Sequence, residues 1–343
     1  MNNQTFWNAI LQHIESTASP LVLYVVVASK KGSPGNPGFA MTVAMKGEKE
    51  SVIGTIGGGI MEQSLINEAV NSLRKGEQMH WIRTLQHQKR ETGTSSASED
   101  FTPSGLICAG SQTVVACTLT LKDTPILSLI GNATSNNTPL VMQLSPTGIA
   151  VRFGSGTDSS VSFSRFSLRH ESVTDWLYEE LLGAPDTVVI AGGGHVGLAL
   201  SRQMALLGWY VLVCDDREHL ETMTNNTVAN ERITQPYEQL GSTVSQQIHT
   251  GRRTFVVVAT TAYNSDITAL RALAKMTEQP EYIGIMGSRA KIHTIFREAE
   301  VNGVSRKWLQ TLHAPIGVGI NSDTPEEIAV SIAAELIGVK NAR

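Results

Sequence analysis

The stretch VVIAGGGHVGLAL, Val188 to Leu200, decides the fold of the C-terminal half of this 343-residue chain. It begins as a short apolar run, passes through a glycine cluster and continues with apolar residues at helical spacing. Gly192, Gly194 and Gly197 make a G-x-G-x-x-G pattern at the junction. The first glycine permits the turn, the second lets the backbone approach a pyrophosphate, and the third allows close packing of helix on strand. The pattern predicts a phosphate-binding turn.

Strand-like and helix-like segments alternate after this turn. Three further apolar runs have the lengths of buried strands, at 209–215, 254–261 and 282–287. Thr324, Pro325 and Glu327 then predict the capped start of a last helix. Continuous apolar strands separated by helices favour a parallel sheet covered on both faces, so we predict a Rossmann-like doubly wound α/β domain over 171–343.

The first half has a different pattern and predicts an α+β domain over 1–170. Helices are expected at 6–14 and 60–74. The segments expected to form strands are 20–29, 39–45, 51–56, 112–121, 125–131, 139–144 and 148–153. The polar segment 88–105 is expected to be a loop, and the interdomain linker to lie near 154–172.

The composition limits the classes of function. A net charge of −4 and 17% charged residues give no electrostatic signature for nucleic acid or anionic lipid. The N-terminus lacks the features of a signal peptide, and the longest apolar run, 21–28, is too short to cross a bilayer. We therefore expect a cytoplasmic protein with no nucleic-acid or membrane partner. A homodimer is a further expectation, motivated by the apolar strands and the glycine-rich first domain.

Several residues near the first glycine turn are candidates for ligand contact. Asp215 ends the second predicted strand, where an acidic residue is expected to hold a ribose hydroxyl. Arg217, two positions later, either contacts a ligand, where it would tolerate a phosphate, or simply faces solvent in a loop. His195 lies inside the motif, either as a ligand contact or as the start of the helix.

A second candidate anion site follows the run YIGIMG. Ser288 is placed to cap a helix, and Arg289 and Lys291 add positive charge beside its first amides. The alternative is a capped helix with exposed basic residues.

The first domain holds a third glycine turn and a cysteine of interest. Gly57, Gly58 and Gly59 separate a strand from a helix and leave the backbone open to a ligand or to close packing. Glu62 is either a functional carboxylate or a partner of the helix dipole. Cys108 is flanked by small residues that leave its thiol approachable to a metal or cofactor, and the alternative is a small buried hydrophobic residue. Cys117 and Cys214 are expected in cores.

Recognisable acid–base machinery is missing from the pattern. The nine histidines are scattered and show no metal-ligand spacing, and the three cysteines have no zinc-like spacing. An NAD(P)-dependent oxidoreductase remains an alternative because of the glycine turn with Asp215. A regulatory module that binds a dinucleotide and catalyses no reaction is a third possible function.

Together the motifs resemble the XdhC/CoxI family, the accessory factors of molybdenum hydroxylases. In the first domain the matching blocks are KGSPGNPGFAMTV, GTIGGGIME and SGLICAGSQ. In the second they are GGGHVGLAL, VCDDR, YIGIMGSRAK and HAPIGVGINSDTPEEIAVSIAAEL. The resemblance implies a protein that binds the molybdenum cofactor, as molybdopterin or its dinucleotide, and protects it during sulfuration with a cysteine desulfurase. Such a protein then helps to insert the cofactor into a hydroxylase such as xanthine dehydrogenase.

The resemblance also implies roles for single residues. Cys108 matches the cysteine of the family's C-G-G block and becomes a candidate contact to the metal, since a thiolate suits molybdenum. The glycine turns, Glu62 and Asp215 match family positions, which places the phosphate end of the cofactor on the second domain and the metal end on the first. Three departures stand out: CAG replaces C-G-G, the turn GSPGNPG lacks a basic residue, and TTAYNSD lacks histidines before Asp266.

Overall fold

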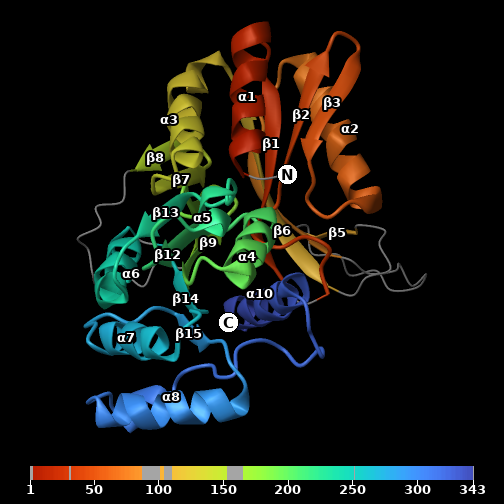
Figure 1. Cartoon of the computed structure of the whole chain (residues 1–343). Coiled ribbons are helices and arrows are strands. Elements are labelled where there is room, and N and C mark those ends of the chain that lie inside the picture. The colour runs from red at the N-terminus through yellow and green to blue at the C-terminus, as the bar shows by residue number, and fades with distance from the viewer. Residues whose placement is uncertain are drawn as a thin grey trace. The chain divides into compact units, whose positions relative to one another are not determined.

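The computed structural model describes residues 3–30, 32–86, 101–103, 110–152, 165–250 and 252–342 (Figure 1). The chain divides into two compact units, Met1–Ala184 and Pro185–Arg343. Strand β9 (Phe166–Ser172) pairs with β10 (Asp175–Leu182), so the chain remains in the first unit across residue 170. Each unit has its own sheets and its own hydrophobic cores.

The first unit contains two sheets. The larger has the order β3 (Lys49–Gly54), β2 (Ala40–Lys46), β1 (Leu21–Ser29), β6 (Ser111–Leu119), β4 (His80–Gln86) and β5 (Phe101–Pro103). Its neighbouring strands are antiparallel except for β4 and β5. The smaller sheet is antiparallel, with the order β8 (Gly148–Arg152), β7 (Leu140–Ser145), β10 and β9.

Strand β1 is buried on both faces, which explains its unbroken apolar sequence. Leu21 and Leu23 belong to a core with helices α1 (Asn3–Thr17) and α3 (Thr124–Ser135) and the smaller sheet. Val22 and Tyr24 face the opposite way and pack with helix α2 (Gly59–Lys75). Alternation along one strand therefore joins two cores.

The strand predicted at 125–131 is wrong, because this segment lies in helix α3. Pro125 occupies the first helical turn, where its missing N–H costs nothing. Leu127 and Ile130 are fully buried, and Thr134 continues the same helical spacing. The short 3-10 turn η1 (Leu121–Asp123) leads into the helix. A seven-residue apolar run does not by itself separate a strand from one face of a helix.

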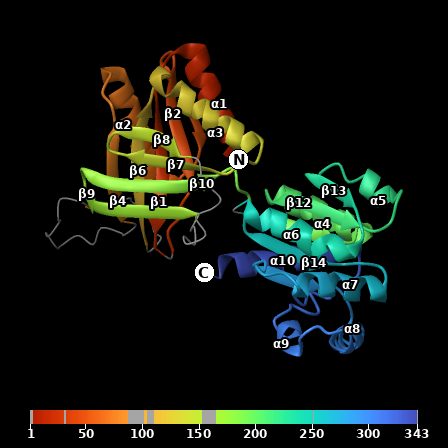
Figure 2. The ribbon, with the colours of Figure 1, turned by 90° about the vertical axis from the view of Figure 1, so that its left-hand side faces the viewer.

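The second unit is a five-stranded parallel sheet covered on both faces, as predicted (Figure 2). Its order is β13 (Glu231–Thr234), β12 (Tyr210–Asp215), β11 (Thr187–Ala191), β14 (Thr254–Val258) and β15 (Tyr282–Ile285). One face packs with α4 (His195–Leu206) and α10 (Pro325–Asn341). The other packs with α6 (Leu240–His249), α7 (Tyr263–Ala274) and α8 (Arg289–Val301). The short helices are α5 (Glu221–Thr224), η2 (Tyr237–Gln239) and α9 (Arg306–Leu309).

Several local predictions are confirmed. Thr324 and Glu327 form the capping box of α10, and Pro325 occupies its first turn. Cys117 and Cys214 are buried in the cores of the two units, and burial raises the pKa of each thiol to about 12. Within the described ranges, every helix is too short or too polar to span a bilayer.

Candidate functional site

The glycine turn of the second unit lies at the carboxyl edge of the parallel sheet. Strand β11 lies in the middle of the sheet, with β12 on one side and β14 on the other. The order of connection reverses at this strand, and such a switch point is where doubly wound sheets bind ligands. The segments that follow β11, β12 and β14 therefore define the candidate site.

The three glycines of the motif lie in three different structural environments. Gly192 has a φ of +124°, and a Cβ there would lie 2.2 Å from the carbonyl oxygen of Ala259. A Cβ on Gly197 would lie 2.0 Å from the carbonyl oxygen of Gly192. Gly194 instead faces open space and precedes the first helical residue, His195, which is exposed. The turn thus brings the first amides of α4 to an uncovered surface, where an anion would be stabilised.

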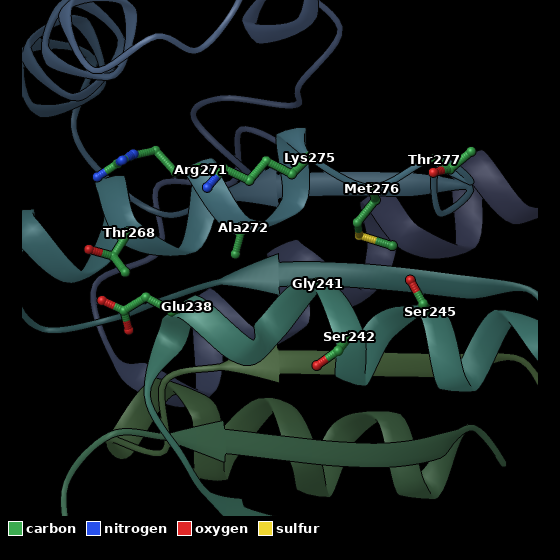
Figure 3. A pocket seen from close by; sticks show the side chains of 10 residues that line it. All are labelled: Glu238, Gly241, Ser242, Ser245, Thr268, Arg271, Ala272, Lys275, Met276 and Thr277. Atoms are coloured by element: carbon green, nitrogen blue, oxygen red, sulfur yellow. The ribbon is translucent and has the colours of Figure 1, made fainter.

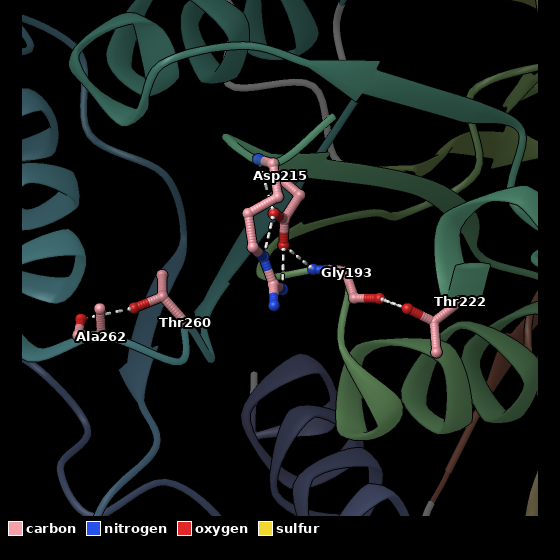
Figure 4. Close-up of polar contacts among 6 residues, drawn as sticks. Gly193, Asp215, Thr222, Thr260 and Ala262 are labelled. Carbon is pink, nitrogen blue, oxygen red and sulfur yellow. Dashed lines mark hydrogen bonds and ion pairs between the residues drawn. The ribbon is translucent and has the colours of Figure 1, made fainter. Parts of the chain in front are cut away.

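Asp215 is completely buried and holds the turn together (Figure 4). Its Oδ2 accepts hydrogen bonds from the amide of Gly193 at 2.7 Å and from Nη2 of Arg217 at 2.8 Å. Its Oδ1 accepts from the amide and Nε of Arg217, at 3.0 and 2.8 Å. On the other side of the turn, the hydroxyl of Thr222 donates to the carbonyl oxygen of Gly193.

These four contacts change what Asp215 can do. A carboxylate has about four lone-pair positions, and this chain fills all of them. Burial raises the pKa of Asp215, but the bonds from Arg217 and Gly193 outweigh burial, and the net pKa lies below its ordinary value. A ribose hydroxyl would have to displace Arg217 to reach the carboxylate. The Arg217 side chain is 39% exposed, and its guanidinium is the group that the turn offers to a ligand.

A second polar group lies after β14 and connects it to α8. Asp266, fully buried in the first turn of α7, accepts from the Thr260 hydroxyl at 2.6 Å and contacts Nζ of Lys291 at 2.7 Å. Thr260 also donates to the carbonyl oxygen of Ala262 (Figure 4). Lys291 is therefore engaged in an ion pair. Sequence reasoning missed this pair because its partners are 25 positions apart in different elements.

The start of α8 agrees with the predicted cap. The hydroxyl of Ser288 accepts from the amide of Lys291 at 3.2 Å, and Arg289 is exposed. Since Lys291 pairs with Asp266, Arg289 is the basic residue left at this helix start. The arrangement matches the capped helix and keeps a cation beside its amides.

In the first unit, Glu62 closes the glycine turn before α2. Its Oε2 accepts from the Thr55 hydroxyl at 2.7 Å and from the amides of Ile56 and Gly58 at 3.0 and 2.9 Å. A Cβ on Gly58 would meet nothing within 4 Å, so the turn is uncovered there. Glu62 therefore shapes the loop, as Asp215 does in the second unit.

A buried glutamine joins this turn to the other glycine-rich loop of the first unit. Gln112 donates to the carbonyl oxygen of Ile56 at 3.1 Å and accepts from the amide of Gly35 at 3.3 Å. Gly57, at φ +124°, abuts Gly35, with a Cβ placed 2.8 Å from its nitrogen. A Cβ on Gly110 would lie 2.8 Å from the Ser33 hydroxyl. The segments around Gly35, Gly57 and Gly110 thus meet at this point. The sequence signal for this contact was Gln112, a polar residue near the start of the apolar strand β6.

Cys108 lies outside the described residues, two positions before Gly110. Among the residues that are described, no three histidine, cysteine or acidic side chains gather as metal ligands would.

A cavity of about 400 Å³ lies between η2, α6 and α7 (Figure 3). Its walls include Glu238, Arg271 and Lys275. None of the site residues predicted from the sequence lines it, and Gly241 lets the two helices approach closely there, with a Cβ placed 2.7 Å from the carbonyl oxygen of Ala272.

The fold and the two glycine turns define a two-unit protein that pairs an α+β domain with a Rossmann-type domain. Comparison with family models gives two matches, the XdhC and CoxI family over residues 16–86 and the XdhC Rossmann domain over residues 188–336. The matched segments lie one in each unit and together span more than half of the sequence. The chain belongs to the XdhC/CoxI family.

Individual relatives agree with this placement. The chain is 32% identical over 160 residues to the uncharacterized protein YqeB of Escherichia coli. This match covers 46% of this chain and 28% of that protein. It is 27% identical over 180 residues to a probable xanthine dehydrogenase subunit of Bacillus subtilis, 52% of this chain and 51% of the relative. The matches thus span about a quarter and about half of these curated relatives. The crystal structure of a xanthine dehydrogenase from Bacillus halodurans superposes with a TM-score of 0.65 at 22% identity, covering 100% of this chain and 97% of the other, which shows a shared fold.

Proposed function

We propose that this protein binds the molybdenum cofactor, protects it while its terminal sulfur ligand is installed, and helps to insert it into a molybdenum hydroxylase such as xanthine dehydrogenase. Its partners are that hydroxylase and a cysteine desulfurase. Family membership and the similarity to a probable xanthine dehydrogenase subunit support this proposal.

The observation that carries the proposal is the occupied carboxylate of Asp215. Gly193 and Arg217 fill all the acceptor positions of Asp215. The turn therefore presents the uncovered amides of α4 and the Arg217 guanidinium to its ligand. Amides at a helix start and a guanidinium suit a phosphate group. Molybdopterin ends in a phosphate, so the donors of this turn fit that end of the cofactor.

Each predicted ligand residue has a part in this proposal. Gly192, Gly194 and Gly197 shape the phosphate turn, and His195 and Arg217 border it. Ser288 and Arg289 form a second anion contact. In the first unit, Gly57 to Gly59 and Glu62 form the uncovered turn, and Cys108 supplies a thiolate to the metal end. When bound, the cofactor supplies the redox-active metal that the hydroxylase uses.

The test is to release pterin by denaturation from protein made in molybdate-supplied cells. Wild-type protein should release pterin, and Cys108→Ala protein should release much less. Cys117→Ala is the matched control, because Cys117 is buried in the core of the same unit and should leave the pterin content unchanged. Absence of pterin from the wild-type protein would contradict the proposal.

An NAD(P)-dependent oxidoreductase is the second candidate. The glycine turn at the switch point favours it, and it requires that a ribose hydroxyl displace Arg217 from Asp215 at the end of β12. Titration with NADH and NADPH separates the two functions. Micromolar binding with turnover of a carbonyl substrate would support the oxidoreductase, whereas binding with neither turnover nor pterin would indicate a regulatory module.

A further inference from the structure

The first unit contains a cavity to which the roles proposed for the glycine turns assign no ligand. It has a volume of about 400 Å³ and is bordered by α1, the loop before β2, the end of β3 and the β9–β10 pair. Phe6, Thr55, Arg165, Phe166 and Glu180 are among its lining residues. Cavities that hold small ligands span roughly 300–1,000 Å³, so this one is large enough for a bicyclic ring.

A buried carboxylate forms part of the cavity wall. Glu180 is 5% exposed, and its Oε2 accepts from the hydroxyl of Tyr178 at 3.1 Å. A Cβ built on Gly38 would lie 3.3 Å from Oε1 of Glu180, and Gly38 lines the cavity, so Oε1 borders the empty space. No described residue donates a hydrogen bond to Oε1. Oε1 can therefore accept a hydrogen bond from a ligand in the cavity.

Two further side chains, Arg165 and Phe166, line the cavity beside Glu180 and add a cationic group and an aromatic ring. Nε of Arg165 is buried and has no hydrogen-bond partner among the described residues. Its guanidinium carbon lies 5.5 Å from the centre of the Phe166 ring. A Cβ on Gly38 would lie 2.6 Å from that ring, so only glycine lets Phe166 occupy its place. The cavity therefore offers a flat apolar surface with one acceptor group and one donor group.

We propose that this cavity binds a 2-amino-4-oxopyrimidine ring, the hydrogen-bonding edge that pterins and guanine share. The ring N–H and the 2-amino group would donate to Glu180, the 4-oxo group would accept from Arg165, and the ring would pack on Phe166. A carboxylate accepts two parallel N–H donors well, which makes it selective for this edge. Assigning the ring to the pterin of the molybdenum cofactor rests on the proposed function.

The position of the cavity supports that assignment. Thr55 lines the cavity and donates its hydroxyl to Glu62, the residue that closes the turn at Gly57 to Gly59. The cavity and the uncovered glycine turn are therefore adjacent parts of one unit. A ring in the cavity would have the rest of its molecule beside that turn.

The test measures binding of three probes to the full chain by equilibrium dialysis: neopterin, GMP, and lumazine, which has a 2-oxo group in place of the 2-amino group. Neopterin should bind at least about tenfold more tightly than lumazine, and Glu180→Gln should weaken neopterin binding by about tenfold or more. Glu179→Gln is the matched control, because Glu179 lies on the same strand but bonds to Gln143 and Arg152. Phe166→Leu should also weaken binding, which provides a second variant if Glu180→Gln folds poorly.

The outcomes separate this proposal from the proposed function. Equal neopterin binding by wild type and Glu180→Gln, or no binding of any probe, overturns the cavity assignment. Unchanged pterin content in purified Glu180→Gln protein overturns it too and leaves the proposed function standing. Glu180-dependent neopterin binding by a protein that carries no pterin from cells supports the cavity and contradicts the proposed function. Preference for GMP over neopterin by tenfold or more overturns the assignment to a pterin.

Discussion

Replacing Glu180 with glutamine should stabilise the first unit at alkaline pH and not at acid pH. Burial raises the pKa of Glu180 from 4.5 to about 7, although the nearby Arg165 and the hydroxyl of Tyr178 act in the opposite direction. The unfolded chain releases this proton near pH 4.5, whereas the folded unit holds it until about pH 7. Between these values the folded state binds more protons, so the free energy of unfolding falls as pH rises.

The size of the effect follows from the pKa difference. Each pKa unit corresponds to about 1.4 kcal/mol, so the charged Glu180 lowers the free energy of unfolding by about 3 kcal/mol above pH 7. Glutamine has no charge to lose and keeps an oxygen for the Tyr178 hydroxyl. The stability of Glu180→Gln relative to wild type should therefore increase by about 2.5 kcal/mol between pH 5 and pH 8, because the unfolded chain has already released part of this proton at pH 5.

Hydrogen exchange of the β10 amides, followed by mass spectrometry, measures the stability of the first unit separately from the second. Wild type and variant are compared at the same pH, so the intrinsic exchange rate cancels. Glu179→Gln is the control with the opposite sign: burial raises the pKa of Glu179, but its bonds to Gln143 and Arg152 outweigh burial and lower the net value. A stability difference between Glu180→Gln and wild type that stays constant from pH 5 to pH 8 would refute the reasoning.

Three further predictions concern the second unit and are measured by urea unfolding. Gly197→Ala should lose about 3 kcal/mol because its Cβ would overlap a backbone carbonyl, whereas Gly194→Ala, facing open space, should unfold like wild type; equal midpoints would disprove this geometry. Asp215→Asn should lose about 3 kcal/mol at pH 7, and its difference from wild type should disappear as pH falls below 3.8, since the lowered pKa of Asp215 stabilises the fold only while the group is ionised. Lys291→Met should cost about 3 kcal/mol by leaving Asp266 buried without its cation, and adding Asp266→Asn should restore most of the loss; additive losses would argue against the pair.

Residue types and spacing were enough to predict the second unit. The apolar runs around 188–191 and 209–215 and the glycine pattern between them specify a parallel strand, a turn and a helix through local rules alone. The cap at Thr324 was equally readable, since its partners lie within three residues. The helix α3 could not be predicted from the sequence, because the side on which Leu127 and Ile130 are buried depends on what packs against them.

The candidate site divides in the same way. The sequence by itself determined the glycine turns, the helix starts and the acid at the end of β12, because each depends on neighbours along the chain. Only the tertiary structure decided that Arg217 and Gly193 fill the acceptor positions of Asp215, and that Gln112 joins two glycine loops. The same is true of Glu180, which lines a cavity whose other walls come from distant segments. Partners, burial and pKa depend on which remote groups come within a few ångströms, and spacing along the chain carries no such information.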